Sequence, residues 1–224
     1  MKQFFRKGIK LWETEVSLRI FFISILILNF VLTPLSSSQE SGAFIARSFY
    51  IFLIISGSYA LIKSRVITYI IILFSFVAFI VWLLSYDNNI LWLTVLDGLL
   101  QVLFYLIFLF LILIKVFKGG VYSNQRLEGA MTGYLLIGNL FATLYYTINL
   151  IMGPNTFHIP GGEHIADFTY FSFSTLTTLG YGDIVPVLPV VRSLSNLEGV
   201  IGQLYPTVLI ARLLSLENLR GSKS

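Results

Sequence analysis

The sequence has 224 residues, of which 56% are hydrophobic and only 12% are charged. Soluble domains carry about a quarter charged residues, so this composition excludes an ordinary soluble domain and indicates a membrane protein. The absence of cysteine excludes a disulfide framework and a thiolate metal site. The net charge of +4 does not indicate nucleic-acid binding, because the basic residues lie between apolar runs and form no patch.

Six apolar segments are each long enough to cross a bilayer, which takes about twenty residues. They cover residues 16–35, 44–62, 66–84, 90–116, 129–152 and 191–214. All six are too long for strands, and a helix satisfies its own backbone hydrogen bonds in lipid. The sequence therefore predicts an all-α polytopic membrane protein with six transmembrane helices.

The lysines and arginines predict the orientation of these helices, because cytoplasmic loops carry an excess of them. After six crossings, most of them fall on one side: Lys2, Arg6, Lys7, Lys10, Arg19, Lys63, Arg65, Lys115, Lys118, Arg126, Arg212, Arg220 and Lys223. Only Arg47 and Arg192 fall on the other. We therefore expect both termini in the cytoplasm. The expected membrane is the plasma membrane, or the inner membrane if the protein is bacterial.

The link between the fifth and sixth segments contains Thr-Thr-Leu-Gly-Tyr-Gly-Asp, residues 177–183. Successive carbonyls of a strand alternate in direction, so they point the same way only if the backbone alternates between right- and left-handed regions. Glycine enters the left-handed region at little steric cost, and Gly180 and Gly182 are two residues apart. Carbonyls aligned in this way can replace the hydration shell of a cation.

Residues 167–186 resemble the pore segment and selectivity filter of tetrameric potassium channels, specifically the bacterial six-helix type with a two-helix pore module. The resemblance implies that potassium binds the carbonyls of Thr178, Leu179, Gly180 and Tyr181, with the Thr178 hydroxyl closing the inner end and Gly182 completing the filter. It further implies a homotetramer, so the partners are three further copies and lipid. The permeant ions are the only cofactor, and no residue is catalytic.

The resemblance also divides the chain into two domains. Residues 126–224 form the pore domain, with an outer helix, a re-entrant pore helix, the filter, an inner helix and a short cytoplasmic tail. Residues 1–125 form a peripheral four-helix bundle, where voltage-gated relatives carry a sensor with regularly spaced arginines. The fourth segment has only Lys115, at its inner end, so we expect no steep voltage gating. Asp97 in this segment is expected to form a structural ion pair with Arg47, or else to serve gating or a ligand.

Several residues around the filter have expected supporting roles: Asp167, Phe171, Ser174, Thr177 and Asp183. Asp167 opens the pore helix and can cap its free N–H groups. Phe171 and Ser174 stand where relatives carry a hydrogen-bonding tryptophan and an acid or apolar residue, so the Tyr181 hydroxyl is expected to lack its usual partner. Asp183 either concentrates cations at the outer mouth or anchors the loop.

The sixth segment contains the expected hinge and cavity residues. Gly202 matches the bending glycine of relatives, and it either softens the helix or allows close packing against the pore helix. Pro206 predicts a kink. Gln203 is expected to face the central cavity, and Glu198 to bond a pore-helix hydroxyl such as Ser174 or Thr175.

The outer loop contains His158 and His164, which are interpreted as solvated loop residues, with a pH-sensitive mouth as the alternative.

Two other functions compete with a potassium channel. The first is a weakly selective cation channel, or a silent subunit of one. The second is an intramembrane aspartyl protease, because Tyr86-Asp87 and Gly180–Asp183 resemble that family's two motifs. Its two carboxylates must meet within the membrane, whereas these lie at segment ends, and its Pro-Ala-Leu element is missing.

Overall fold

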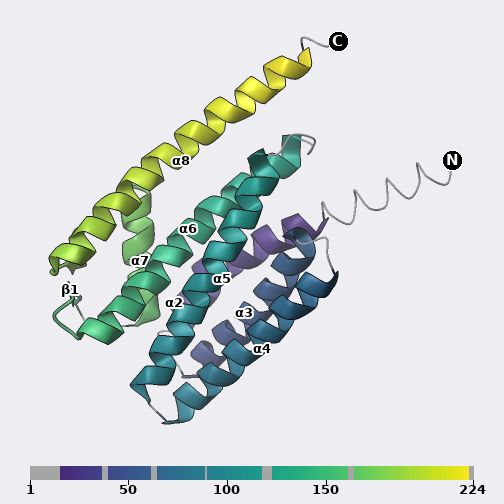
Figure 1. Ribbon diagram of the computed structural model, residues 1–224. Helices are drawn as coiled ribbons and strands as arrows, with labels where there is room; N and C mark the ends of the chain where they lie inside the picture. The colour runs from purple at the N-terminus through teal and green to yellow at the C-terminus, as the bar shows by residue number, and fades with distance from the viewer. Residues whose placement is uncertain are drawn as a thin grey trace. The chain divides into compact units, whose positions relative to one another are not determined.

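The computed structural model of the chain describes residues 16–36, 40–61, 65–88, 90–117, 123–160 and 164–221. Nearly all of them are helical, as Figure 1 shows. The chain divides into two compact units, Met1–Leu136 and Ile137–Ser224. The division falls inside the helix Ser123–Met152.

The first unit contains the helices that cover the first four predicted segments. Residues 16–27 are helical and continue through a π-helical turn, η1 (Leu28–Leu32), into α2 (Thr33–Ser36). The helices that follow are α3 (Glu40–Leu61), α4 (Arg65–Asn88) and α5 (Leu91–Phe117).

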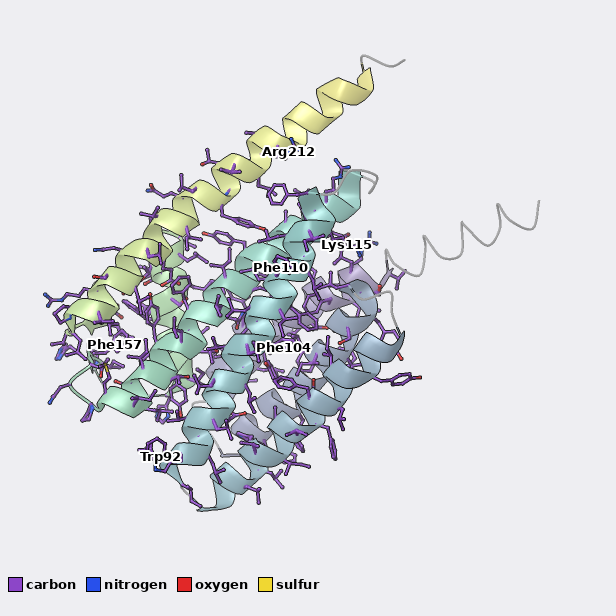
Figure 2. All side chains as sticks on the ribbon, viewed as in Figure 1. Trp92, Phe104, Phe110, Lys115, Phe157 and Arg212 are labelled. Carbon is purple, nitrogen blue, oxygen red and sulfur yellow. The ribbon has the colours of Figure 1, made fainter. Side chains whose placement is uncertain are left out.

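Aromatic rings form the core of this first unit. The ring centroids of Phe104 and Phe108 in α5 are 4.2 Å apart, and those of Phe21 and Phe108 are 5.8 Å apart. A Cβ on Gly57 of α3 would lie 2.8 Å from the Phe21 ring and would also overlap the Phe108 ring, so only glycine fits. Phe104 is labelled in Figure 2.

Polar contacts join the helix ends on one side of the first unit. The Arg19 Nε lies 2.9 Å from the Glu128 Oε1, and the Lys115 Nζ donates to the Ala60 carbonyl at 2.8 Å. Glu128 belongs to α6 (Ser123–Met152), which begins in the first unit and ends in the second. A Cβ on Gly129 would lie 2.9 Å from Val116, so the start of α6 packs closely on α5.

Asp97 is buried in α5, where the Gln101 Nε2 donates to its Oδ2 at 2.8 Å. The expected partner Arg47 lies in α3, but its side chain is outside the described part of the structure. The ion pair therefore stays a prediction, and Gln101 is a partner that the sequence did not indicate.

The second unit contains the end of α6 and four further elements: β1 (Phe157–His158), α7 (Ile165–Leu176), β2 (Val185–Pro186) and α8 (Pro189–Gly221). The two strands pair antiparallel, with Phe157 opposite Pro186 and His158 opposite Val185. α8 is one helix through Pro206 (Figure 1), and the kink expected there stays a prediction.

Within the described residues, three helices are long and apolar enough to cross a membrane: Val16–Leu35, Leu91–Phe117 and Arg126–Met152. They correspond to the first, fourth and fifth predicted segments. Shorter apolar helical stretches, Ser48–Leu61 and Leu73–Leu84, lie in α3 and α4. The fold is thus that of an all-α membrane protein, while the count of six crossings and the orientation stay predictions.

Candidate functional site

The segment between β1 and β2 contains α7, and Asp167 stabilises the first turn of this helix. The Asp167 Oδ2 accepts the backbone N–H of His164 at 2.9 Å. The first N–H groups of a helix have no partner within it, and a side chain that folds back on the preceding residue fixes where the helix begins. The sequence predicts His164 as a solvated loop residue. It is exposed in the structure, and it is also the N-terminal cap residue of α7.

The other end of α7 binds the glycine-containing stretch, residues 177–183. Carbonyls of the last helical turn accept hydrogen bonds from N–H groups of this stretch. The Thr178 N–H donates to the Thr175 carbonyl at 2.9 Å. The Leu179 and Gly180 N–H groups both donate to the Ser174 carbonyl, at 2.9 and 3.1 Å. The last carbonyls of a helix lack partners within it, so these bonds satisfy the helix end and anchor the stretch together.

The backbone of this stretch alternates in hand. Thr178, Gly180 and Gly182 have φ of 60°, 57° and 82°, whereas Leu179 and Tyr181 between them are outside the left-handed region. Such alternation turns successive carbonyls toward one side. Among the described residues, no hydrogen bond ends on the carbonyls of residues 178–181. Within the described part of the chain, these four carbonyls therefore have no backbone donor.

The side chains of the stretch are exposed, although two of them are large and apolar. Leu179 is 62% exposed and Tyr181 is 66% exposed. The Tyr181 ring stacks on Tyr170 of α7, with centroids 5.8 Å apart and planes 9° apart. Asp183, at the outer end of the stretch, is exposed as well. Large apolar side chains that are exposed in one chain can contact another molecule.

An aromatic cluster packs behind α7. Phe171 is buried with its ring centroid 5.2 Å from Tyr145 of α6 and 5.4 Å from Phe157 of β1. Phe157, labelled in Figure 2, also contacts Phe168 at 5.3 Å. Phe171 thus fills the core behind the helix. Ser174 is buried too, and its hydroxyl donates to the Phe171 carbonyl at 3.1 Å within its own helix.

Two glycines let the neighbouring helices approach α7 closely. A Cβ on Gly138 of α6 would lie 2.6 Å from the ring of Phe173. A Cβ on Gly202 of α8 would lie 2.7 Å from the carbonyl carbon of Leu176 and would overlap its oxygen. Of the two interpretations of Gly202, close packing against α7 is therefore the one that an observed contact supports. Gln203 is exposed and Pro206 half-buried on the same helix, and their functional roles stay predictions.

Glu198 of α8 is completely buried and bonds two hydroxyl groups. The Tyr145 hydroxyl lies 2.7 Å from its Oε2, and the Ser172 hydroxyl lies 2.5 Å from its Oε1. The expected bond to a hydroxyl of α7 is present, but its partner is Ser172 and not one of the two suggested residues, Ser174 and Thr175; the Ser174 hydroxyl bonds within α7. A buried acid in an apolar segment needs a polar partner. The presence of Glu198 in the sixth segment therefore predicts a hydrogen bond but does not identify which hydroxyl makes it.

A comparison with protein families bears on this same region. Residues 133–216 match the family described as "Ion channel", which covers the end of α6, the whole of α7, the glycine-containing stretch and most of α8. No curated protein and no solved structure matches the chain. The match supports an ion-channel family for less than half of the chain and, with the apolar helices, indicates a membrane-embedded ion channel. It points to transport and not to catalysis.

Proposed function

We propose that the chain is the subunit of a potassium-selective channel, in which the carbonyls of Thr178, Leu179, Gly180 and Tyr181 take the place of the ion's water. The observation that carries this proposal is the positive φ at every second residue, Thr178, Gly180 and Gly182. A cation that leaves water needs several oxygens held on one side of the chain, and this alternation supplies them.

The anchoring of the stretch supports the same function. Three consecutive N–H groups, those of residues 178–180, are bonded to the last turn of α7. The backbone of the stretch is therefore fixed through its donors, whereas the carbonyls of residues 178–181 accept no hydrogen bond from the described residues. Coordinating oxygens that keep their places discriminate between ions by size or by field strength, so the arrangement favours a selective filter over a wide aqueous pore.

The assembly that this function requires is a homotetramer, because one chain offers only one wall of an ion path. The exposed Leu179 and Tyr181 side chains support contact with further copies at this wall. We therefore propose that three further copies and the surrounding lipid are the partners, with both termini in the cytoplasm of a plasma-membrane protein.

Gating by membrane voltage is not part of the proposal. A voltage sensor needs several charges that move through the field. The one basic residue of α5 is Lys115, in its last turn, and its ammonium group bonds the Ala60 carbonyl. A single lysine that is hydrogen-bonded to the end of a neighbouring helix does not supply a steep response to membrane voltage.

Reconstitution of the purified chain in liposomes tests this function. With potassium and sodium in opposed gradients, we expect the current to reverse close to the potassium equilibrium potential. A reversal near zero would reject the selective filter in favour of a weakly selective cation channel. Light scattering of the detergent-solubilised protein is expected to give four times the mass of one chain, and a monomer that conducts nothing would remove the proposal altogether.

A further inference from the structure

Glu198 joins three helices at a place that the conduction path does not use. Its side chain is 0% exposed in α8. Its two oxygens are bonded to Tyr145 of α6 at 2.7 Å and to Ser172 of α7 at 2.5 Å. Ser172 is also 2.8 Å from the carbonyl of Gly138 in α6. A single carboxyl group is therefore the centre of a buried polar network behind the pore helix.

The protons of this network can be counted. The Ser172 hydroxyl has one proton but lies within hydrogen-bond distance of two acceptors, the Gly138 carbonyl and the Glu198 Oε1. If Ser172 donates to Gly138, the contact with Glu198 is a hydrogen bond only when the carboxyl itself donates. Tyr145 can donate to the other carboxyl oxygen. All three contacts are satisfied together only if Glu198 carries a proton.

The surroundings of Glu198 also favour the neutral form. Tyr145 is the titratable group that faces it from α6, and from α7 it meets only the Ser172 hydroxyl. Within the described part of the chain, no ion pair involves Glu198, so no cation compensates its charge. A buried carboxylate without a counter-charge is far more costly than a buried carboxylic acid.

We propose that Glu198 is a protonated positioning residue that holds the pore helix in its conducting place, and that its deprotonation closes the filter. Loss of the proton to solvent leaves a carboxylate that accepts the Ser172 proton, so Ser172 no longer bonds Gly138 of α6. This inference rests on the proposed channel function and adds its regulation: conduction falls as the pH rises.

The connection from Ser172 to the filter is short. Ser174, two residues further along α7, accepts the N–H groups of Leu179 and Gly180 through its carbonyl. A shift of α7 away from α6 therefore moves the anchor of the filter directly. Sub-ångström displacements matter here, because the coordinating oxygens must keep their spacing.

Potassium flux of reconstituted wild-type protein and of Glu198→Gln, with equal pH on both sides, tests the proposal. We expect wild-type flux to fall about tenfold between about pH 6 and about pH 9. Glutamine can donate to Ser172 and accept from Tyr145 as the neutral acid does, so Glu198→Gln is expected to conduct without this pH dependence. A wild-type flux that ignores pH, beside a Glu198→Gln variant that fails to conduct, would overturn the proposal. Glu128→Gln, which alters the exposed ion pair, is the matched control and should keep the wild-type profile.

Infrared difference spectroscopy of the full-length protein detects the Glu198 proton independently of any flux measurement. With glutamate isotopically labelled, we expect a band of a protonated glutamic acid at neutral pH, which vanishes at alkaline pH and shifts in Ser172→Ala. Absence of this band would overturn the assignment even if Glu198→Gln does not fold. A band that behaves as expected in a protein without flux would instead preserve the protonated Glu198 and reject the channel function.

Discussion

Gly202 of α8 packs against the carbonyl group of Leu176, the last residue of α7, with no room for a side chain between them. Leu176 is completely buried and is followed within two residues by the alternating backbone of residues 178–182. The position of α8 is therefore fixed at the point where α7 ends. If residues 178–182 form the proposed filter, a change at this contact acts on the filter without touching any of its residues.

We expect Gly202→Ala to destabilise the protein by about 3 kcal/mol and to abolish flux, because the added methyl group meets backbone that cannot retreat. Thermal unfolding and flux of the reconstituted protein measure the two effects. Gly199→Ala is the control, since its Cβ would lie 3.9 Å from the Thr175 carbonyl, an ordinary contact. It should conduct and be as stable as wild type. If Gly202→Ala is stable and alters only opening and closing, Gly202 is a bending point and the packing argument is wrong.

Gly180→Ala is expected to lower potassium flux at least about tenfold, because a Cβ at φ 57° disfavours the left-handed conformation by about 1–2 kcal/mol. The comparison variant is Gly153→Ala, at the end of α6. Gly153 has φ 88°, and neither position has an atom within 4 Å of the added Cβ. Both variants therefore introduce the same backbone penalty with open space around the methyl group. Equal loss of flux in both would show that general destabilisation, and not the filter, is responsible.

Thr178→Gly separates stability from ion binding. A β-branched residue at φ 60° is strained, so glycine should raise the free energy of unfolding by about 1 kcal/mol. The lost hydroxyl should at the same time weaken potassium binding, seen as a smaller rise in melting temperature when potassium replaces sodium.

Thr177→Gly is the matched control for this prediction. Thr177 has φ −82°, and its hydroxyl donates to the Phe173 carbonyl at 2.6 Å. Glycine there should destabilise the protein by about 1–2 kcal/mol, through lost backbone rigidity and a lost hydrogen bond. A Thr178→Gly variant that loses as much stability as Thr177→Gly would contradict the strain at Thr178.

Gly57→Ala tests whether the peripheral bundle matters for selectivity. The added methyl group would press on the buried rings of Phe21 and Phe108 and cost about 1–3 kcal/mol in thermal stability. The double variant Gly57→Ala with Phe108→Leu should recover part of this loss. We expect the potassium-to-sodium permeability ratio to stay unchanged in both, and a changed ratio would show that the bundle shapes the filter.

The sequence predicted the helical membrane fold well, because long apolar segments leave the chain no other way to satisfy its backbone. The first segment, residues 16–35, is confirmed as a candidate span with the same bounds. The π-helical turn at Leu28–Leu32 was not predicted, since an extra residue in one helical turn leaves no mark in the hydrophobic pattern. The hydrophobic pattern also places the start of this helix too late, at residue 129, because the first turns of α6 from Ser123 are polar.

The candidate site was predictable where residue type dictates conformation and not where packing does. Gly180 and Gly182 were expected in the left-handed region, and both have positive φ. Thr178 shares that conformation although threonine disfavours it, so only the surrounding hydrogen bonds select it. The partners of Glu198 depend on how α7 is rotated against α6 and α8. Gly138 and Gly202 both lie in close contact with α7; the sequence suggested such a contact for Gly202 but not for Gly138.

The two strands have a consequence for engineering. Phe157 pairs with Pro186 and His158 with Val185, so main-chain bonds hold together the two ends of the segment that contains α7 and the proposed filter. A loop whose ends are already held has lost most of the entropy that closure costs. Residues 157–186 should therefore behave as a cassette, exchangeable as one piece between related pores, provided that the graft keeps a small residue opposite Leu176.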